Sequence, residues 1–354
     1  MIAPRPAVPS IWPAAASAGA AGAGLAILVN RNAKRGGRRV AAQIATTLPG
    51  ASVRLTRTEG EIEAWLGRLA TSPSVRAIFA AGGDGTIVAL VNAMARMGPP
   101  DQDLPTAGIL PLGTGNGWAH ALGAPKLHRC LALLAGTSGA LPTRRCSLIE
   151  VEGTLAHFAG SGWDAMILND YRRQVEQSRG PSRRLSKTMY GYVSAALFRT
   201  TPRVALFGNP RVVIENLGPV VYTVDVDGRP RALPELGPGA VLYDGPVGTA
   251  SVGTCPEFGY RFKAFPFAER IPGFMSVRVY ARDALHAVTA IPRLWSGAHP
   301  LDGMHDWLAT HIRMTFSRPM PLQIGGDAHG MRHTVEYRTI TRGIRMVDWR
   351  RIPS

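Results

Sequence analysis

Hydrophobic and polar residues alternate along the first 140 residues with two different periods. Short apolar runs are typical of buried strands, and longer runs with apolar residues three or four positions apart are typical of helices on a sheet. The short runs predict strands over Leu25–Val29, Ser52–Thr56, Val75–Ala81 and Thr106–Pro111. The longer runs predict helices over Gly37–Thr47, Glu59–Ala70, Ile87–Met97 and Lys126–Ala135. This alternation predicts an α/β domain with a parallel sheet and helices on both faces.

The pattern changes after about residue 141, where short strands separated by Gly and Pro turns predominate. The predicted strands are Ser147–Val151, Leu155–Gly160, Arg203–Leu206, Arg211–Ile214, Val220–Val226, Met275–Tyr280, Ile312–Phe316 and Leu322–Ile324. The clearest helices are Lys187–Arg199 and Asp283–Trp295. We therefore expect a flexible N-terminal arm (1–22), the α/β domain (23–140), a β-rich sandwich domain (141–335) and a C-terminal segment (336–354) that returns to the first domain.

The charge and the cysteine content of the chain indicate which kinds of partner and compartment to expect. The chain has 354 residues and a formal net charge of +16, which favours an anionic partner such as nucleic acid, nucleotide phosphates or an acidic membrane surface. Its three cysteines are far apart and form no CxxC pair, so we expect a reducing cytoplasm and neither a disulfide scaffold nor a cysteine zinc site. No run of 18 apolar residues occurs, so any membrane contact is expected to be peripheral.

A glycine-rich turn follows the third predicted strand and opens the next helix, with the sequence Gly82-Gly83-Asp84-Gly85-Thr86. Adjacent glycines let the backbone approach a phosphate closely, and the helix N-terminus favours negative charge. Asp84 can hold Mg²⁺ through water, and the Thr86 hydroxyl can donate to phosphate. Taken alone, the same residues could form an ordinary tight turn.

Two other polar turns follow neighbouring strands. The fourth strand runs into Gly113-Thr114-Gly115-Asn116, and the first strand runs into Asn30-Arg31-Asn32. Because ligands of parallel sheets bind at the carboxyl ends of the strands, three such turns predict a nucleotide site.

These three turns, in this order and spacing, resemble the diacylglycerol kinase catalytic domain, a family that includes bacterial lipid kinases, sphingosine kinases and ceramide kinases. The resemblance extends over about residues 24–350 and is strongest in the first domain. It implies an ATP-dependent lipid kinase, a phosphotransferase with an alcohol acceptor. It also implies that ATP and Mg²⁺ lie between the two domains, where the lipid hydroxyl enters.

The resemblance implies roles for individual residues. Asn30 and Asn32 would contact the nucleotide, and Thr56 or Thr58 would lie near the adenosine. The phosphates and Mg²⁺ would be held by two loops, namely Gly82, Gly83, Asp84, Gly85 and Thr86, and Gly113, Thr114, Gly115 and Asn116. Asp84 is the expected metal ligand, and Asp164 in the Gly160–Ala165 segment would orient the acceptor hydroxyl. Asp164 could instead cap a helix.

The chain departs from the family pattern at several positions. Arg31 replaces a usual Pro, Lys34 a usual Gly, and Gly117 a usual Asp. Near the C-terminus Gly325 and Asp327 stand where the family has the acids of Asp-Gly-Glu, and Ile271–Phe274 replaces an Asp-Gly segment linked to a structural Mg²⁺. We expect Asp327 to be the catalytic base, with Asp84 second and His329 a further candidate.

Two basic clusters suggest a surface for anionic lipids. One lies in Tyr171–Arg203, and the other comprises Arg31, Lys34, Arg35, Arg38 and Arg39. Such charges favour peripheral attachment to the inner face of the membrane, although they could also form a solvated surface. No nucleic-acid recognition motif accompanies them, so we expect no nucleic-acid partner.

Three functions remain in competition. The first is a lipid kinase acting on a diacylglycerol-like or ceramide- or sphingoid-like alcohol, and the second is an NAD kinase-like enzyme, which shares the glycine–Asp–glycine turn. The third is a catalytically impaired homologue that binds nucleotide or lipid, an alternative that Gly117 and Gly325 keep open. The sequence leaves the acceptor lipid and the oligomeric state undetermined.

Overall fold

The computed structural model describes residues 20–31, 37–70, 75–98, 102–113, 115–163, 165–166, 208–340 and 342–353. The chain forms two compact units. The first, called the α/β unit below, comprises residues 1–113, 122–146 and 341–354, and the second, called the β unit, comprises residues 114–121 and 147–340. The predicted strand at 203–206, the predicted helix at 187–199 and the basic cluster at 171–203 lie outside the described residues.

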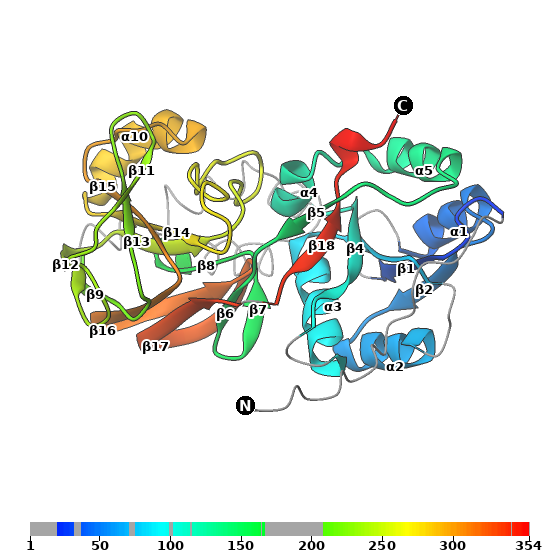
Figure 1. The fold of residues 1–354 in the computed structure, drawn as a ribbon, viewed down its shortest axis with the longest axis horizontal. Coiled ribbons are helices and arrows are strands. Elements are labelled where there is room, and N and C mark those ends of the chain that lie inside the picture. Colours follow the sequence, from blue (N-terminus) through cyan, green and yellow to red (C-terminus); the bar gives the residue numbers. More distant parts are fainter. Residues whose placement is uncertain are drawn as a thin grey trace, which may run out of the picture. The chain divides into compact units, whose positions relative to one another are not determined.

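The α/β unit contains a six-stranded sheet in the order β2-β1-β3-β4-β18-β5 (Figure 1). Its strands are β1 (Leu25–Asn30), β2 (Ser52–Thr56), β3 (Ala77–Gly82), β4 (Leu104–Pro111), β5 (Thr143–Cys146) and β18 (Ile344–Val347). All neighbours pair in parallel except β18 and β5, which are antiparallel. Its helices are α1 (Gly37–Thr47), α2 (Glu59–Ala70), α3 (Asp84–Met97), α5 (Leu127–Gly136) and the 3₁₀ helix η2 (Trp349–Arg351).

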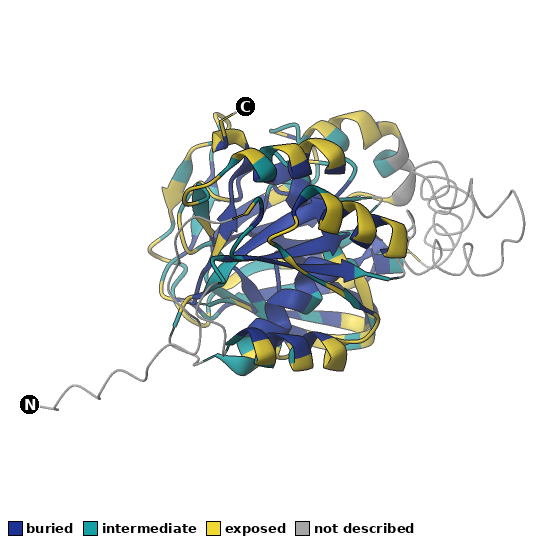
Figure 2. Ribbon diagram, turned by 90° about the vertical axis from the view of Figure 1, so that its right-hand side faces the viewer, coloured by how far each residue is buried: buried dark blue, intermediate teal, exposed yellow. Residues whose placement is uncertain are grey.

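Helices cover both faces of this sheet. The chain moves outward from β1 to β2 and then reverses direction to add β3 and β4, so right-handed crossovers place α1 opposite α2 and α3. Consistently, α1 packs with α5, and α2 packs with α3. Strands β1 and β3 are buried, and the helices expose their outer sides (Figure 2). The predicted α/β class is confirmed.

The β unit is built on antiparallel strands. Its order is β11-β10-β15-β14-β13-β8-β16-β17-β6-β7, and β9 pairs with both β16 and β12, giving twelve strands among the described residues. Their bounds are β6 (Ile149–Val151), β7 (Thr154–Ala156), β8 (Phe158–Gly162), β9 (Arg211–Asn216), β10 (Tyr222–Val224), β11 (Pro230–Ala232), β12 (Val241–Pro246), β13 (Thr249–Gly253), β14 (Met275–Tyr280), β15 (Met304–Ala309), β16 (His311–Ile324) and β17 (Asp327–Thr339). The helices α4 (Gly117–Ala121) and α10 (Ala284–Ser296) belong to the same unit.

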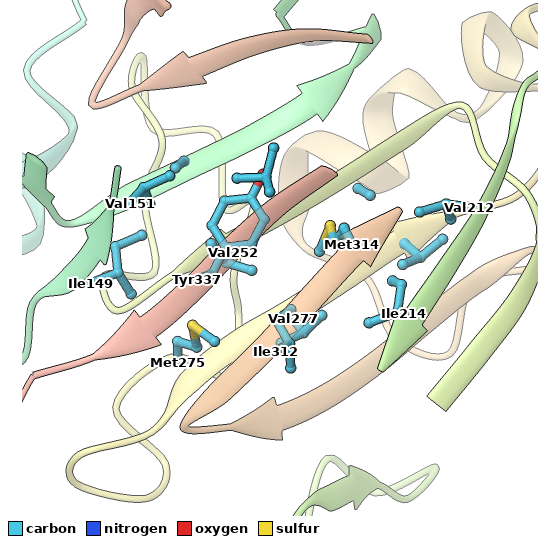
Figure 3. Close-up of a cluster of buried hydrophobic side chains, with 14 of the residues drawn as sticks. Ile149, Val151, Val212, Ile214, Val252, Met275, Val277, Ile312, Met314 and Tyr337 are labelled. Atoms are coloured by element: carbon cyan, nitrogen blue, oxygen red, sulfur yellow. The ribbon is translucent and has the colours of Figure 1, made fainter. Parts of the chain in front are cut away.

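Side chains from several strands of the β unit share one core (Figure 3). Ile214 from β9, Val252 from β13 and Val277 from β14 pack in the same buried cluster as Met314 from β16 and Tyr337 from β17. The predicted β-rich class is therefore confirmed, and β16 joins the sheet together by pairing with β8, β9 and β17.

The long strand β16 pairs with different strands along its length. Its first part, predicted as Ile312–Phe316, pairs with β9, and its last part, predicted as Leu322–Ile324, pairs with β8. Its pairing with β17 shifts register between Thr315 and Met320, a stretch that contains Pro319, which has no N–H to donate. None of the helices in the described part of the chain is long and apolar enough to cross a bilayer.

Candidate functional site

In the α/β unit the strands that follow β1 are added first on one side, as β2, and then on the other side, as β3. Open parallel sheets bind ligands at such a change in strand order. Asn30 ends β1, and the first glycine loop follows β3. The Asn30 side-chain amide donates a 3.0 Å hydrogen bond to the Thr86 hydroxyl in the first turn of α3. Two residues that the sequence assigned to nucleotide binding from separate turns therefore meet at this point of the sheet.

The first glycine loop needs small residues for steric reasons. A Cβ on Gly82 would collide with the side chain of Thr86, so a larger residue would displace the Thr86 hydroxyl. Gly83 caps α3 without a side chain, and its carbonyl accepts a 3.0 Å hydrogen bond from the Thr86 amide. Asp84 is partly exposed and Gly85 is exposed, and both lie at the positive end of the α3 dipole.

The beginning of the second glycine loop is joined directly to the first. The backbone amides of Leu112 and Gly113 donate to the Gly82 carbonyl at 2.8 and 3.2 Å. A Cβ on Gly83 would lie 3.2 Å from the Gly113 Cα, so the two loops touch through backbone atoms. Backbone packing of this kind lets amides from two loops approach the same anion.

The second loop then continues into the β unit. Thr114 lies outside the described residues, as do Asn32 and Asp164. Asn116 adopts a left-handed backbone with φ of 51°, and its carbonyl accepts a 2.9 Å hydrogen bond from the His120 amide, which starts α4. Gly115 also belongs to this turn, and its carbonyl accepts a 3.0 Å hydrogen bond from the Tyr260 amide.

A steric constraint accounts for Gly117, which departs from the family pattern. A Cβ at this position would lie 2.8 Å from the Phe258 carbonyl carbon and 2.9 Å from the Gly259 nitrogen. Both are backbone atoms and cannot swing aside. The close approach of this segment therefore excludes the usual Asp as well as every other side chain.

The two threonines proposed for the adenosine side differ in their surroundings. Thr56 is buried at the end of β2, in register with Asn30. The Thr58 hydroxyl accepts a 3.3 Å hydrogen bond from the Glu61 amide, while the Glu61 carboxylate accepts a 2.7 Å hydrogen bond from the Arg57 amide. This pattern is a variant of the capping box in which Glu61 accepts from the residue before the cap, and it gives Thr58 a structural role at the start of α2.

Asp327 lies at the end of a tight hairpin between β16 and β17. Ile324 pairs with Asp327 across Gly325 and Gly326, whose φ angles of 56° and 86° fit a type I′ turn. The Gly325 amide donates a 2.9 Å hydrogen bond to the Phe158 carbonyl, which fixes the turn on β8. Asp327 itself is exposed, and His329 is partly exposed on the same hairpin.

Two aromatic rings in contact connect this hairpin to the second glycine loop within the β unit. The rings of Phe158 and Phe258 have centroids 4.3 Å apart, and the Phe258 backbone abuts Gly117. The fold thus links the Asp327 hairpin to the turn at Gly115–Gly117, although the two segments are about 210 residues apart in the sequence. Sequence reasoning missed the linking segment, because its aromatic residues resemble an ordinary hydrophobic core.

The donor set at the first loop fits magnesium held mainly by a nucleotide. Among the described residues no group of three or more His, Cys, Asp or Glu side chains could enclose a metal ion. Asp84 offers one carboxylate and Thr86 one hydroxyl, and Mg²⁺ is commonly bound by one or two carboxylates together with substrate phosphates.

The segment that replaces the family's second acidic site contains apolar residues. Ile271 and Phe274 pack against the cluster of Val224, Phe267 and Leu308, and the Phe274 ring meets Tyr222 edge-on at 5.3 Å. Side chains of this kind offer no oxygen ligands, so a magnesium site built on residues 271–274 does not fit this chain.

A buried histidine was also missed by the sequence reasoning. His157 lies between β7 and β8, fully buried, with its ring stacked on Trp118 at a centroid distance of 4.5 Å. Neither ring nitrogen has a hydrogen-bond partner among the described residues. Burial lowers the pKa of His157 to about 3, so the ring is neutral and packs against Trp118 of α4 as an apolar group would.

Comparison with known proteins gives a consistent result. Residues 24–142 match the family described as "Diacylglycerol kinase catalytic domain". The chain is 38% identical over 73 residues to "Probable lipid kinase YegS-like" of Xanthomonas euvesicatoria, covering 21% of this chain and 23% of that protein. It is 29% identical over 161 residues to the protein of the same name in Stenotrophomonas maltophilia, covering 45% and 50%. The matches thus span half or less of these relatives.

The fold has a solved counterpart. The structure of a diacylglycerol kinase from Bacillus anthracis aligns with a TM-score of 0.60 and 15% sequence identity, covering 93% of this chain and 98% of that one. At this identity the likeness concerns the fold, and it extends through both units.

Proposed function

We propose that this chain, whose residues 24–142 match the diacylglycerol kinase catalytic domain family, transfers the terminal phosphoryl group of ATP to the hydroxyl of a lipid alcohol. The observation that carries the proposal is the Asn30–Thr86 hydrogen bond at the change in strand order between β1 and β3. It ties the first strand to a glycine loop that in turn touches the second glycine loop. An anion-binding arrangement of this kind suits a nucleotide polyphosphate.

We assign nucleotide binding to the polar groups at the three turns. Gly82, Gly83 and Gly85 present backbone at the α3 N-terminus, and the Thr86 hydroxyl, held by Asn30, faces the same loop. Gly113, Gly115 and Asn116 extend the phosphate site, with Thr114 between them. For the adenosine side we favour Thr56 over Thr58, because the Thr58 hydroxyl already caps α2.

Mg²⁺ would be held by Asp84 together with the nucleotide phosphates, and when bound it would neutralise charge that develops on the phosphate oxygens. The protein's own part is to orient the acceptor and to accept its proton. In this transfer the acceptor oxygen bonds to the γ-phosphorus, the bond from that phosphorus to the β,γ-bridging oxygen breaks, and ADP leaves. The hydroxyl proton passes to a carboxylate.

We assign that carboxylate to Asp327. Its hairpin is rigid, since a Gly-Gly type I′ turn is held on β8 by the Gly325–Phe158 hydrogen bond. Rigid placement matters because an Asp reaches one methylene less far than the Glu usual in the family. Asp84 is a poorer base, since a carboxylate engaged by Mg²⁺ has little affinity for a proton. Asp164 remains our candidate for orienting the acceptor.

We propose that the enzyme acts in the cytoplasm at the inner face of the membrane. The support is electrostatic, since the chain has a net charge of +16 and carries Arg31, Arg38 and Arg39 close together in the sequence beside the first strand. Basic residues near an anionic headgroup layer each contribute about 1 kcal/mol of attraction.

Transfer of labelled phosphate tests the proposal. Purified protein is incubated with γ-labelled ATP, Mg²⁺ and a bacterial lipid extract, or with NAD in place of lipid, and the products are identified by mass spectrometry. We expect a phosphorylated lipid, and we expect Asp327→Asn to lower kcat by about 10²–10⁴-fold. The matched control is Asp227→Asn, an exposed aspartate in the β10–β11 turn.

Each competing function predicts a different result. Phosphorylated NAD without phosphorylated lipid would indicate an NAD kinase-like enzyme. Binding of ATP without transfer to either acceptor would indicate a nucleotide-binding homologue that has lost catalysis. Full turnover by Asp327→Asn, with loss of turnover in Asp84→Asn, would keep the kinase but refute our choice of base.

A further inference from the structure

The segment that covers the second glycine loop forms a hairpin of its own. Gly259 pairs with Phe262 in an isolated antiparallel bridge, and the Phe262 amide donates a 2.8 Å hydrogen bond to the Gly259 carbonyl. The two residues at the tip, Tyr260 and Arg261, have φ angles of 51° and 62°. Two consecutive left-handed residues make this a type I′ turn.

The residues at this tip are not those the backbone prefers. Type I′ turns strongly favour Asn-Gly or Gly-Gly, because a side chain in left-handed conformation is strained. The same chain uses Gly325-Gly326 for the type I′ turn before Asp327. The turn itself does not require Tyr260 and Arg261. We therefore infer that their side chains have a function.

The hairpin holds its tip rigidly beside the second glycine loop. The Tyr260 amide donates to the Gly115 carbonyl at 3.0 Å, and a Cβ on Gly259 would lie 3.5 Å from the Gly115 Cα. The base of the hairpin is clamped by two ring contacts, Phe258 with Phe158 at 4.3 Å and Phe262 with Trp295 of α10 at 5.2 Å. Arg261 is thus held next to Tyr260, whose backbone amide contacts Gly115.

Charge around the tip favours an anionic ligand. Arg261 is exposed and forms no ion pair with any acidic residue in the described ranges. The acid closest in sequence, Glu257, lies instead 3.6 Å from His120 on α4. A guanidinium presented on a rigid turn, without a carboxylate partner, matches the bidentate geometry of a phosphate.

We propose that Arg261 binds the β- or γ-phosphate of the nucleotide at the Gly115–Asn116 turn and so acts as a further substrate-binding residue of the β unit. This assignment rests on the proposed function, because it takes the second glycine loop to be a phosphate site. Such a residue raises the affinity for nucleotides that carry the phosphate it contacts. Its removal should therefore weaken the binding of ATP but not of AMP, which has neither the β- nor the γ-phosphate.

Calorimetric titration of the full chain with ATP and with AMP tests the proposal. Arg261→Gly should weaken ATP binding by about tenfold, as expected for loss of a charge-assisted hydrogen bond, and leave AMP binding unchanged. The same variant should melt at a higher temperature, because Gly relieves the left-handed strain. Arg261→Met should show the weaker ATP binding without the gain in melting temperature. Arg270→Met, which removes an exposed arginine from the following connection, should bind ATP like the wild type.

The outcomes separate this proposal from the function on which it rests. Wild-type protein that binds no ATP would overturn the proposed function and this assignment together. ATP binding by the wild type that is equalled by both Arg261 variants would overturn the assignment alone. Equal weakening of ATP and AMP would also overturn it, since a disturbed turn affects both ligands. A raised KM for the lipid with unchanged ATP affinity would place Arg261 on the acceptor side instead.

Discussion

Gly117 offers a direct test of how the second glycine loop is packed. A Cβ there would lie 2.8–2.9 Å from three backbone atoms of Phe258 and Gly259, closer than real Cβ atoms approach. Gly117→Ala should therefore destabilise the protein although it adds one methyl group and sits at a helix start. Forcing extra atoms into a packed site costs about 1–3 kcal/mol. For a domain of this size that corresponds to a fall in melting temperature of roughly 3–10 °C.

Gly117→Asp, which restores the residue usual in the family, should be at least as destabilising as Gly117→Ala, because the clash arises at the Cβ that both share. The matched control is Gly67→Ala in the middle of α2, where a Cβ would meet only the Met97 methyl at 3.8 Å. That change should stabilise the protein by about 0.5–1 kcal/mol, the helix-propensity difference between Gly and Ala. Opposite signs from the same chemical substitution would isolate the steric cause.

Urea unfolding followed by tryptophan fluorescence measures these differences. The reasoning is refuted if Gly117→Ala is as stable as the wild type, because the Phe258–Gly259 backbone would then be free to move away. An ATP affinity that falls together with stability would further link the covering hairpin to the nucleotide site.

Three other changes test separate parts of the structure. Thr58→Ala should lower the free energy of unfolding by about 1 kcal/mol through loss of the α2 cap and leave the KM for ATP unchanged; a raised KM would return Thr58 to the adenosine side. His157 has a folded pKa of about 3, below its ordinary 6.5, so stability is fully present above pH 6.5 and is lost as pH falls toward 3, at up to about 1.4 kcal/mol per pH unit. His157→Phe should flatten this acid dependence between pH 7.5 and 5.5 in urea unfolding, and an unchanged slope would contradict the assignment. Arg278→Met should cost about 3–5 kcal/mol in thermal or urea unfolding, because it leaves the buried carboxylate of Asp306, now 2.9 Å from the Arg278 guanidinium, with only His299 at 3.5 Å as a partner; a near-neutral effect would contradict a charged Asp306 that depends on Arg278.

Local patterns were sufficient for most of the α/β unit. The predicted helices Gly37–Thr47 and Glu59–Ala70 and the predicted strand Ser52–Thr56 match the observed bounds. These elements carry strong periodicity and clear end signals, such as the capping box at Thr58–Glu61. The glycine loop at residues 82–86 was equally clear, because its chemistry depends on consecutive residues.

The β unit was less predictable. The strands β11, β12, β13 and β15 were not predicted, β7 and β8 were predicted as one strand, and β16 was divided into two. Strands of this kind are stabilised by partners distant in sequence and by the layer they cover, so a single segment carries little of the signal. The residue pattern therefore indicated that this unit is rich in β-strands, but not which strands pair with one another.

The sequence by itself determined most elements of the first unit, the three polar turns and the residue types for phosphate chemistry, since all of these depend on neighbouring residues. Only the tertiary structure decided which of those residues meet. The Asn30–Thr86 hydrogen bond joins residues 56 positions apart, Gly117 is dictated by a backbone about 140 positions away, and Phe158 fixes the turn beside Asp327. Such contacts follow from how strands are ordered and layered, which no local pattern encodes.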